Sequence, residues 1–178
     1  NGALKLTTTA SDNTAVGRRA LCTNTTGTAN VAVGAYSLCL NTTASNNTAV
    51  GFCSLKTNTT GACNVVVGSL ALDANTTGAC NTSVGYGSLS ENTTAPTNTA
   101  VGFYSLLSNT TGVQNVAVGT QALANNTTGH NNSALGRCAL KCMTSGDSNT
   151  GLGSSSGRDI STGRCNSTLG LNAGLNVS

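Results

Sequence analysis

The chain has 178 residues and a net charge of +3; 7% of its residues are charged, 3% are aromatic and 38% are hydrophobic. The hydrophobic residues recur in phase, which excludes a disordered chain, and the eight Lys and Arg are scattered, which excludes a basic footprint for nucleic acid. The apolar runs are far shorter than the about 20 residues of a membrane span, so we expect no membrane insertion. One His and five scattered acidic residues make no acid–base pair, so we expect no enzyme and no cofactor.

Glycine recurs every 17 residues along nearly the whole chain. Each repeat unit begins at an Asn four residues before its glycine and follows the consensus N-[TV]-A-V-G-x-x-[AS]-L-x-x-N-T-T-G-x-x. We number the unit 1 to 17 from this Asn, so that Asn13 is position 1 and Gly17 is position 5. The ten periodic glycines are Gly17, Gly34, Gly51, Gly68, Gly85, Gly102, Gly119, Gly136, Gly153 and Gly170.

This period predicts the fold class. A fixed repeat of about 20 residues is typical of a solenoid. The unit is too short for two packed helices, and its Val, Thr, Asn and Gly are poor helix formers, so short strands punctuated by glycine fit better. We predict an all-β, single-domain parallel β-solenoid, a β-roll or β-helix, of about ten coils over residues 1–178, with a partial first coil 1–12, regular coils 13–165 and a partial final coil 166–178.

Strand alternation assigns faces to the positions of the unit. Position 4 is Val or Leu in all ten units and position 9 is Leu in the first eight, so we expect these two columns to form the core, with position 2 on the face of position 4. Position 8 is always Ala or Ser, which indicates a tight site. Positions 6 and 7 vary freely and are expected to face outward. The Asn residues at position 1 are expected to stack as a ladder at a corner.

Position 12 is predicted to carry an interior ladder of stacked amides. Its Asn is replaced by Met143, Ile160 and Val177 in the last three units, and a site that exchanges Asn for bulky apolar residues is expected to be buried. The N-T-T triplet that begins here also matches the N-glycosylation signal, but we favour its interpretation as a third strand of the coil with Asn inward. The ladder residues are Asn24, Asn41, Asn58, Asn75, Asn92, Asn109 and Asn126. Glycosylation stays open at Asn46, Asn81, Asn131, Asn166 and Asn176.

The eight cysteines have an informative phase. Cys22 and Cys39 share position 10 of neighbouring units, and stacked positions about 4.8 Å apart lie within the usual Cα separation of a disulfide. Cys63 and Cys80 share position 17 in the same way, so we predict both bridges and, less directly, a pair within one coil between Cys138 and Cys142. Cys53 and Cys165 are too far apart to meet and are expected to be free or to bond another chain. Metal binding is the disfavoured alternative, because no CxxC pair occurs. Disulfides indicate an extracellular setting.

All aromatic residues, together with three Arg, fall at positions 6 and 7. If those positions point outward, one edge of the rod carries every aromatic ring, and aromatic and Arg side chains are enriched in interfaces. The partner is expected to be another copy, a cell-surface receptor or a glycan; the alternative is that the rings only cover the tight corner at position 8. The candidate interface residues are Arg18, Arg19, Tyr36, Phe52, Tyr86, Phe103, Tyr104 and Arg137.

The motif N-T-A-V-G-x-x-A-L-x-x-N-T-T-G resembles repeats in bacterial and viral surface fibres. Phage tail-fibre and adhesin-like proteins carry N-T-A-I-G-Y-Q-A-L units of similar length, and the N-V-A-V-G of Asn30 to Gly34 is similar to the heads of trimeric autotransporter adhesins. Those heads are β-rolls that bind host matrix or cells. The resemblance covers residues 3–170 and implies a surface fibre.

We therefore expect a structural protein, namely a subunit or segment of an extracellular fibre that assembles through its ends and its aromatic face. The ends are apolar, with Leu4 and Leu6 at one and Leu171 and Leu175 at the other, so we expect that the chain either continues further or stacks head-to-tail with another copy. One alternative is an ice-binding solenoid; another is a glycan-binding tail-fibre shaft. Ice binding would use a single outward Thr column at position 13, because adjacent strand residues point to opposite faces. That column is Thr25, Thr42, Thr59, Thr76, Thr93, Thr110, Thr127 and Thr144.

Overall fold

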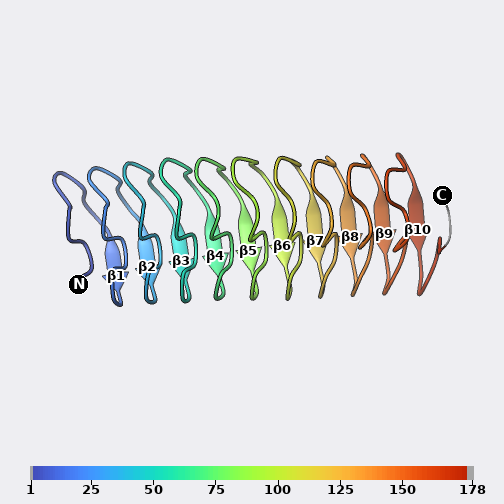
Figure 1. The fold of residues 1–178 in the computed structure, drawn as a ribbon, viewed down its shortest axis with the longest axis horizontal. Helices are drawn as coiled ribbons and strands as arrows, with labels where there is room; N and C mark the ends of the chain where they lie inside the picture. The colour runs from blue at the N-terminus through green and yellow to red at the C-terminus, as the bar shows by residue number, and fades with distance from the viewer. Residues whose placement is uncertain (1, 176–178) are drawn as a thin grey trace.

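The computed structural model describes residues 2–175, and these form a straight rod of stacked coils (Figure 1). Each unit contributes one three-residue strand at positions 2 to 4, and all neighbouring strands are parallel and paired in chain order. The result is a single ten-stranded sheet along one side of the rod, so the predicted parallel β-solenoid is confirmed. The strands are Thr14–Val16 (β1), Val31–Val33 (β2), Thr48–Val50 (β3), Val65–Val67 (β4), Thr82–Val84 (β5), Thr99–Val101 (β6), Val116–Val118 (β7), Ser133–Leu135 (β8), Thr150–Leu152 (β9) and Ser167–Leu169 (β10).

The register never changes along the sheet. Thr14 pairs with Val31 and Val31 pairs with Thr48, so each residue stacks on the residue at the same unit position in the next coil. The same register holds to the last pair, where Ser167 faces Thr150. Every unit position therefore becomes a column that runs along the rod.

The rest of each coil is bonded to its neighbours without being a regular strand. The amide of Leu38 donates to the carbonyl of Ser54 at 3.1 Å, and the amide of Thr42 donates to the carbonyl of Thr59 at 3.2 Å. The expected third strand at N-T-T is a bend instead. Left-handed φ angles recur at positions 7, 9 and 17, for example 61° at Tyr36 and 48° at Leu38, and such residues interrupt the extended backbone of a strand.

The core assignment of position 4 was wrong. Position 3 points inward, and Ala49 and Ala100 are fully buried, whereas Val16 at position 4 is 58% exposed and Leu169 is 76% exposed. Position 2 does share the face of position 4, but that face is the outside of the sheet. The reason is steric, because the leucine column at position 9 fills most of the narrow interior, and no residue larger than the fully buried Val66 stands opposite it at position 3. A Cβ built on Gly151 at position 3 would already lie 2.8 Å from Leu140 Cγ.

The remaining interior columns agree with the sequence. Position 8 is buried in every coil from Ala20 to Ser156, and the leucines of position 9 are fully buried. Glycine at position 5 is required both by conformation and by space: Gly51 has a φ of 140°, and an added Cβ would meet the carbonyl oxygen of Gly68. The buried leucines are Leu21, Leu38, Leu55, Leu72, Leu89, Leu106, Leu123 and Leu140.

Candidate functional site

The interior amide ladder at position 12 is confirmed. Asn75 is fully buried; its Nδ2 donates to Asn58 Oδ1 at 2.8 Å and to the carbonyl of Gly78 at 2.9 Å, while its Oδ1 accepts from Asn92 Nδ2 at 3.1 Å. The same pattern repeats from Asn24 to Asn126. Because each amide satisfies the next, the ladder binds the coils together along the axis of the rod.

The ladder ends where the sequence changes. Asn126 Nδ2 donates to Asn109 Oδ1 at 2.9 Å, but Asn126 Oδ1 is buried and has no hydrogen-bond partner. The next residue in the column is Met143, which offers no amide and is itself fully buried. An unpaired buried polar atom destabilises by about 1–3 kcal/mol, so the last amide is a weak point of the column.

A second amide ladder at position 1 is also confirmed. Asn47 is fully buried, donates to the carbonyl of Gly61 at 3.0 Å, and receives the amide of Asn64 on its Oδ1 at 2.9 Å. Here the side-chain oxygen caps the backbone of the next coil as well as its side chain. Both ladders therefore have structural roles that explain why Asn recurs at these positions.

Burial also decides which glycosylation signals are accessible. The ladder Asn residues of N-T-T are buried, and so is Asn81, so their side chains cannot accept a glycan without opening the coil. Asn46 and Asn131 are exposed at position 17, and Asn166 is half-buried. Asn176 lies outside the described residues, as does Val177.

The structure contains none of the predicted disulfides, because all eight cysteines are free thiols. The expected Cys22–Cys39 and Cys63–Cys80 pairs occupy equivalent positions of neighbouring coils, but neither pair is bonded. Cys138 is buried, and three residues separate it from half-buried Cys142. The extracellular setting therefore receives no support from disulfides.

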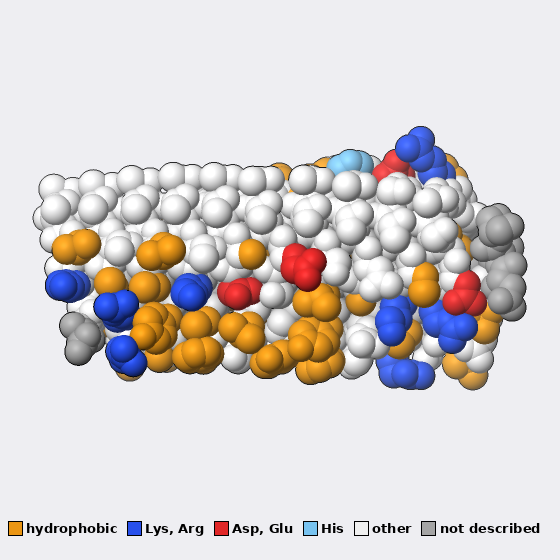
Figure 2. Space-filling view, viewed as in Figure 1, with side chains coloured by type: hydrophobic (Ala, Val, Ile, Leu, Met, Phe, Trp, Pro, Cys, Tyr) orange, Lys and Arg blue, Asp and Glu red, His pale blue; other side chains and the backbone are white. Residues whose placement is uncertain are grey.

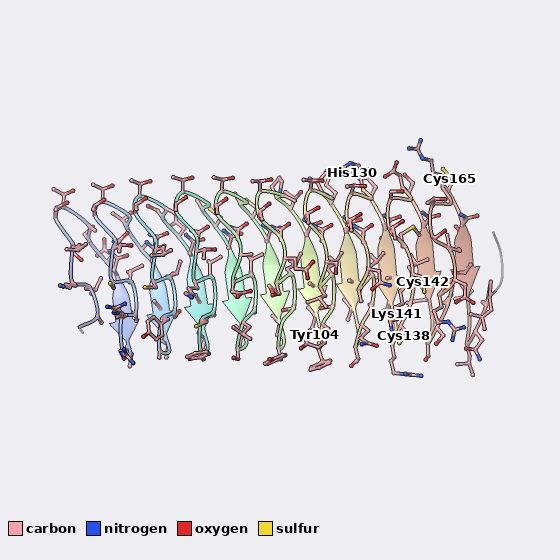
Figure 3. The ribbon with its side chains drawn as sticks, viewed as in Figure 1. Tyr104, His130, Cys138, Lys141, Cys142 and Cys165 are labelled. Atoms are coloured by element: carbon pink, nitrogen blue, oxygen red, sulfur yellow. The ribbon has the colours of Figure 1, made fainter. Side chains whose placement is uncertain are left out.

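Burial raises the pKa of two thiols, Cys39 and Cys53. Burial, and then the adjacent Cys22 thiol, raises the pKa of Cys39. Burial likewise raises the pKa of Cys53, which is only 7% exposed and so is poorly placed to bond another chain. Cys165, by contrast, is exposed at the top of the coils in Figure 3 and remains available.

The aromatic residues gather at one edge of the rod, but position 7 is less exposed than predicted. Phe52, Tyr86 and Phe103 at position 6 are 53%, 43% and 46% exposed. Tyr36 and Tyr104 at position 7 are half-buried, and Cys53 and Cys138 at the same position are buried. Figure 2 shows hydrophobic side chains gathered along this lower edge. Position 6 therefore forms an outer row of this edge, and position 7 forms an inner row.

Two separate clusters make up this edge. Near the N-terminal end, the guanidinium groups of Arg18 and Arg19 lie 5.2 Å and 5.9 Å from the ring centroid of Tyr36, which also meets Phe52 edge-on at 6.4 Å. Arg137, exposed at position 6, lies outside both clusters; its guanidinium is 3.9 Å from Cys138 Sγ.

The second cluster is formed by three rings. Phe103 and Tyr104 have centroids 4.1 Å apart, and Tyr86 lies 5.8 Å from Phe103 and 5.5 Å from Tyr104. Gly87 makes room for it, because an added Cβ would lie 2.5 Å from Tyr104 Cε1. Partial burial and the neighbouring Tyr86 raise the pKa of Tyr104.

Two columns of threonine face outward, not one. Position 13 is half-buried in most coils, and its hydroxyl donates to the carbonyl of position 13 in the next coil, as from Thr59 to Thr76 at 3.0 Å. Position 14 is exposed in every coil. The expected alternation failed because N-T-T is a bend and not a strand. The second column is Thr26, Thr43, Thr60, Thr77, Thr94, Thr111, Thr128, Ser145 and Thr162.

No protein-family model, no curated protein and no solved structure matches this chain. The described residues contain no helix long and apolar enough to cross a membrane. They also contain no group of three or more His, Cys, Asp or Glu side chains placed to hold a metal ion. The outward columns and the two ends of the rod are therefore the features from which a function is inferred.

Sequence reasoning missed two of these columns. The outward Val and Leu of position 4 were assigned to the core because they are apolar in every unit. The exposed Thr of position 14 was assigned inward because a strand was assumed. The available signal was the small size of position 3, which is Ala or Ser in seven of the ten units and is nowhere larger than Val66.

Proposed function

We propose that this chain is a structural segment of an extracellular fibre that lengthens by adding coils at its ends. The observation that carries the proposal is the constant register of the ten-stranded sheet, in which every coil presents the same hydrogen-bonding surface to the next. Repeat proteins normally cap such surfaces with atypical terminal units. The extracellular setting rests on the resemblance of the repeat to those of surface fibres.

The described ends have no such cap. β1 pairs only with β2 and β10 only with β9, so each outermost strand leaves one edge open. In inner coils the amide of position 2 donates to the next coil, as from Thr150 to Asn166 at 2.8 Å, and Ser167 has no following described coil to receive its amide. Leu171 beside this edge is 74% exposed and Leu6 at the opposite end is 51% exposed. Further coils, from this chain or another copy, would pair and pack there.

The test is a proline at the open edge. Ser167→Pro removes the amide that would pair with an added coil, and proline is tolerated on edge strands. Ala79→Pro is the matched control, since the equivalent position of the next coil already holds Pro96. By electron microscopy and sedimentation, we expect wild type and Ala79→Pro to form rods that lengthen with concentration, and Ser167→Pro to stay short. Wild-type rods of one fixed length at every concentration would refute end-to-end growth.

In such a fibre the cluster of Tyr86, Phe103 and Tyr104 would serve as the contact for a receptor or glycan. It combines two half-exposed rings with tyrosine hydroxyl groups, and aromatic side chains of this kind dominate recognition surfaces. The adhesive role is tested by a glycan array read with wild type and Phe103→Ala. Equal binding patterns would remove the cluster as the contact.

Ice binding is a second candidate because two Thr columns face outward side by side. The hydrogen-bonded hydroxyls of position 13 and the exposed side chains of position 14 each repeat once per coil. This regular spacing would order water on the surface. Thermal hysteresis is the measurement. Thr60→Tyr should abolish it, while Thr120→Tyr, at position 6 where Tyr86 occurs naturally, should not. A wild-type chain without hysteresis would exclude this function.

A further inference from the structure

The outer face of the sheet is an uncharged strip along the whole rod. Two side chains of each strand, at positions 2 and 4, point outward from the ten strands. Val65, Val67 and Val116 are 44%, 40% and 42% exposed, and Leu135 is 49% exposed. Position 2 is Val, Thr or Ser, but position 4 is apolar in every strand, and an apolar column of this length on the outside of a folded protein marks a contact with another molecule.

Charge is absent from this face, as it is from the threonine columns of positions 13 and 14, although it occurs at positions 6, 7, 10, 11, 16 and 17. The chain has eight Lys or Arg and five Asp or Glu, and none stands at position 2, 3 or 4 of any unit. The neighbouring outward columns behave differently: position 6 carries Arg18 and Arg137, and position 16 carries Asp147 and Arg164. Solvent exposure alone would allow the same variation on the sheet.

Strand propensity does not account for the apolar column. β-Branched residues favour strands, and Val at position 4 of the first seven coils fits that rule. In the last three coils the residue becomes Leu135, Leu152 and Leu169, which keep the apolar surface and lose the branching. What is retained at position 4 is therefore apolarity on the outside of the rod.

We propose that a second copy of this chain covers the face, packed sheet to sheet and running in the same direction. A molecule that covers the whole strip must be equally straight and must repeat with the same spacing. A second copy of this chain meets both conditions, because it carries the same sheet. A twofold axis parallel to the rod places position 2 of each copy opposite position 4 of the other. The small Thr, Ser or Val then faces the larger Val or Leu, so the two surfaces complement each other.

The area is sufficient for a specific but modest interface. Ten strands about 4.8 Å apart give a strip about 48 Å long, and three residues of about 3.3 Å make it about 10 Å wide. Two copies bury on the order of 1,000 Å² together, which is the lower limit for a specific contact. This sheet-to-sheet pairing does not require end-to-end growth. In a longer fibre each added coil would add buried area to the same interface.

The experiment measures mass against concentration in the full chain carrying Ser167→Pro, so that end-to-end growth is suppressed. Sedimentation from low to high micromolar concentration should show monomers converting to dimers. Val67→Lys brings an ammonium group against Val65 of the second copy and should keep the chain monomeric throughout. Thr60→Lys, at exposed position 14 on another face, should dimerise like its parent.

Circular dichroism checks that each variant folds. If Val67→Lys does not fold, Val67→Thr keeps the branched shape, removes apolar contact, and should raise the dimer dissociation constant several-fold. A parent that stays monomeric at all concentrations overturns the proposal, as does a dimer lost in Thr60→Lys and kept in Val67→Lys. Neither result depends on whether the unblocked chain forms fibres, which is read separately from rod length.

Discussion

The interior amide ladder makes a sharp prediction, because removing one rung should cost far more in the middle than at the end. Asn75→Met removes the amide between two others and leaves Asn58 Oδ1 without a donor and one N–H of Asn92 without an acceptor. Asn126→Met at the end leaves Asn109 Oδ1 unpaired, but it also removes Asn126 Oδ1, which has no partner already. The end substitution therefore adds no net unpaired group, whereas the middle one adds two.

At about 1–3 kcal/mol for each unpaired buried group, Asn75→Met should lose about 2–6 kcal/mol more stability than Asn126→Met. Methionine is the chosen replacement because Met143 already occupies this column fully buried. The carbonyls that each amide also binds keep a second donor, since Asn64 donates to Gly78 at 3.0 Å and Asn115 to Gly129 at 2.8 Å. The difference between the two variants thus isolates the ladder.

The assay is urea unfolding followed by circular dichroism, with hydrogen exchange by mass spectrometry as the local readout. Repeat arrays can unfold in parts, so exchange shows whether opening begins at the substituted coil. We expect faster exchange around residues 58–92 in Asn75→Met and little change around 109–143 in Asn126→Met. Equal losses in both variants would refute the reasoning that ladder continuity, and not the count of amides, sets stability.

Three further outcomes are expected. Thr97→Asn should raise the melting temperature by about 1–4 °C, because Thr97 is β-branched at a φ of 60° and Asn tolerates that conformation better. The control Thr60→Asn should not raise it, because Thr60 does not have a positive φ. Brief alkylation of the native protein read by mass spectrometry should modify exposed thiols such as Cys63 well before Cys39 and Cys53; equal rates would contradict their burial. Stability should fall as the pH rises above about 8.5, because the raised pKa values of Cys39 and Cys53 keep protons on the folded chain that the unfolded chain releases. Replacing both cysteines with Ala should flatten that slope, and an unchanged slope would assign it to other groups.

The period alone predicted the parallel solenoid, because a 17-residue unit without helix formers allows little else. It also predicted both Asn ladders: position 1 is Asn in every unit, and at position 12 the exchange of Asn for Met143 and Ile160 indicates burial. The faces of the strand were not predictable from hydrophobicity. With one short strand in each coil, apolarity alone does not decide which residue faces inward: Ala49 is fully buried, and Val50 beside it is half-buried on the outside of the sheet.

Sequence also could not show the bends. Left-handed conformations at ordinary residues such as Tyr36 and Leu38 have no local signal, because neither residue favours positive φ. The stacking of identical coils imposes them. The bend at N-T-T, in turn, removes the strand alternation on which the single Thr column depended. For the cysteines, phase predicted that Cys22 and Cys39 are neighbours, but it did not show whether a bond forms between them.

Comparing the same unit position across coils distinguishes residues that are constant because they fill the interior from residues that are constant on the surface. Columns that are constant and buried, such as the leucines of position 9 and the amides of positions 1 and 12, are explained by the interior. Columns that vary and are exposed, such as position 17, are ordinary solvent-facing sites. Two outward columns are nearly constant: the apolar position 4, which is exposed or half-buried, and the threonine of position 14, which is exposed. Since neither is needed to fill the core, their uniformity points to extended partners that contact many coils at once, which is why a second rod suits the first and an ordered water lattice the second.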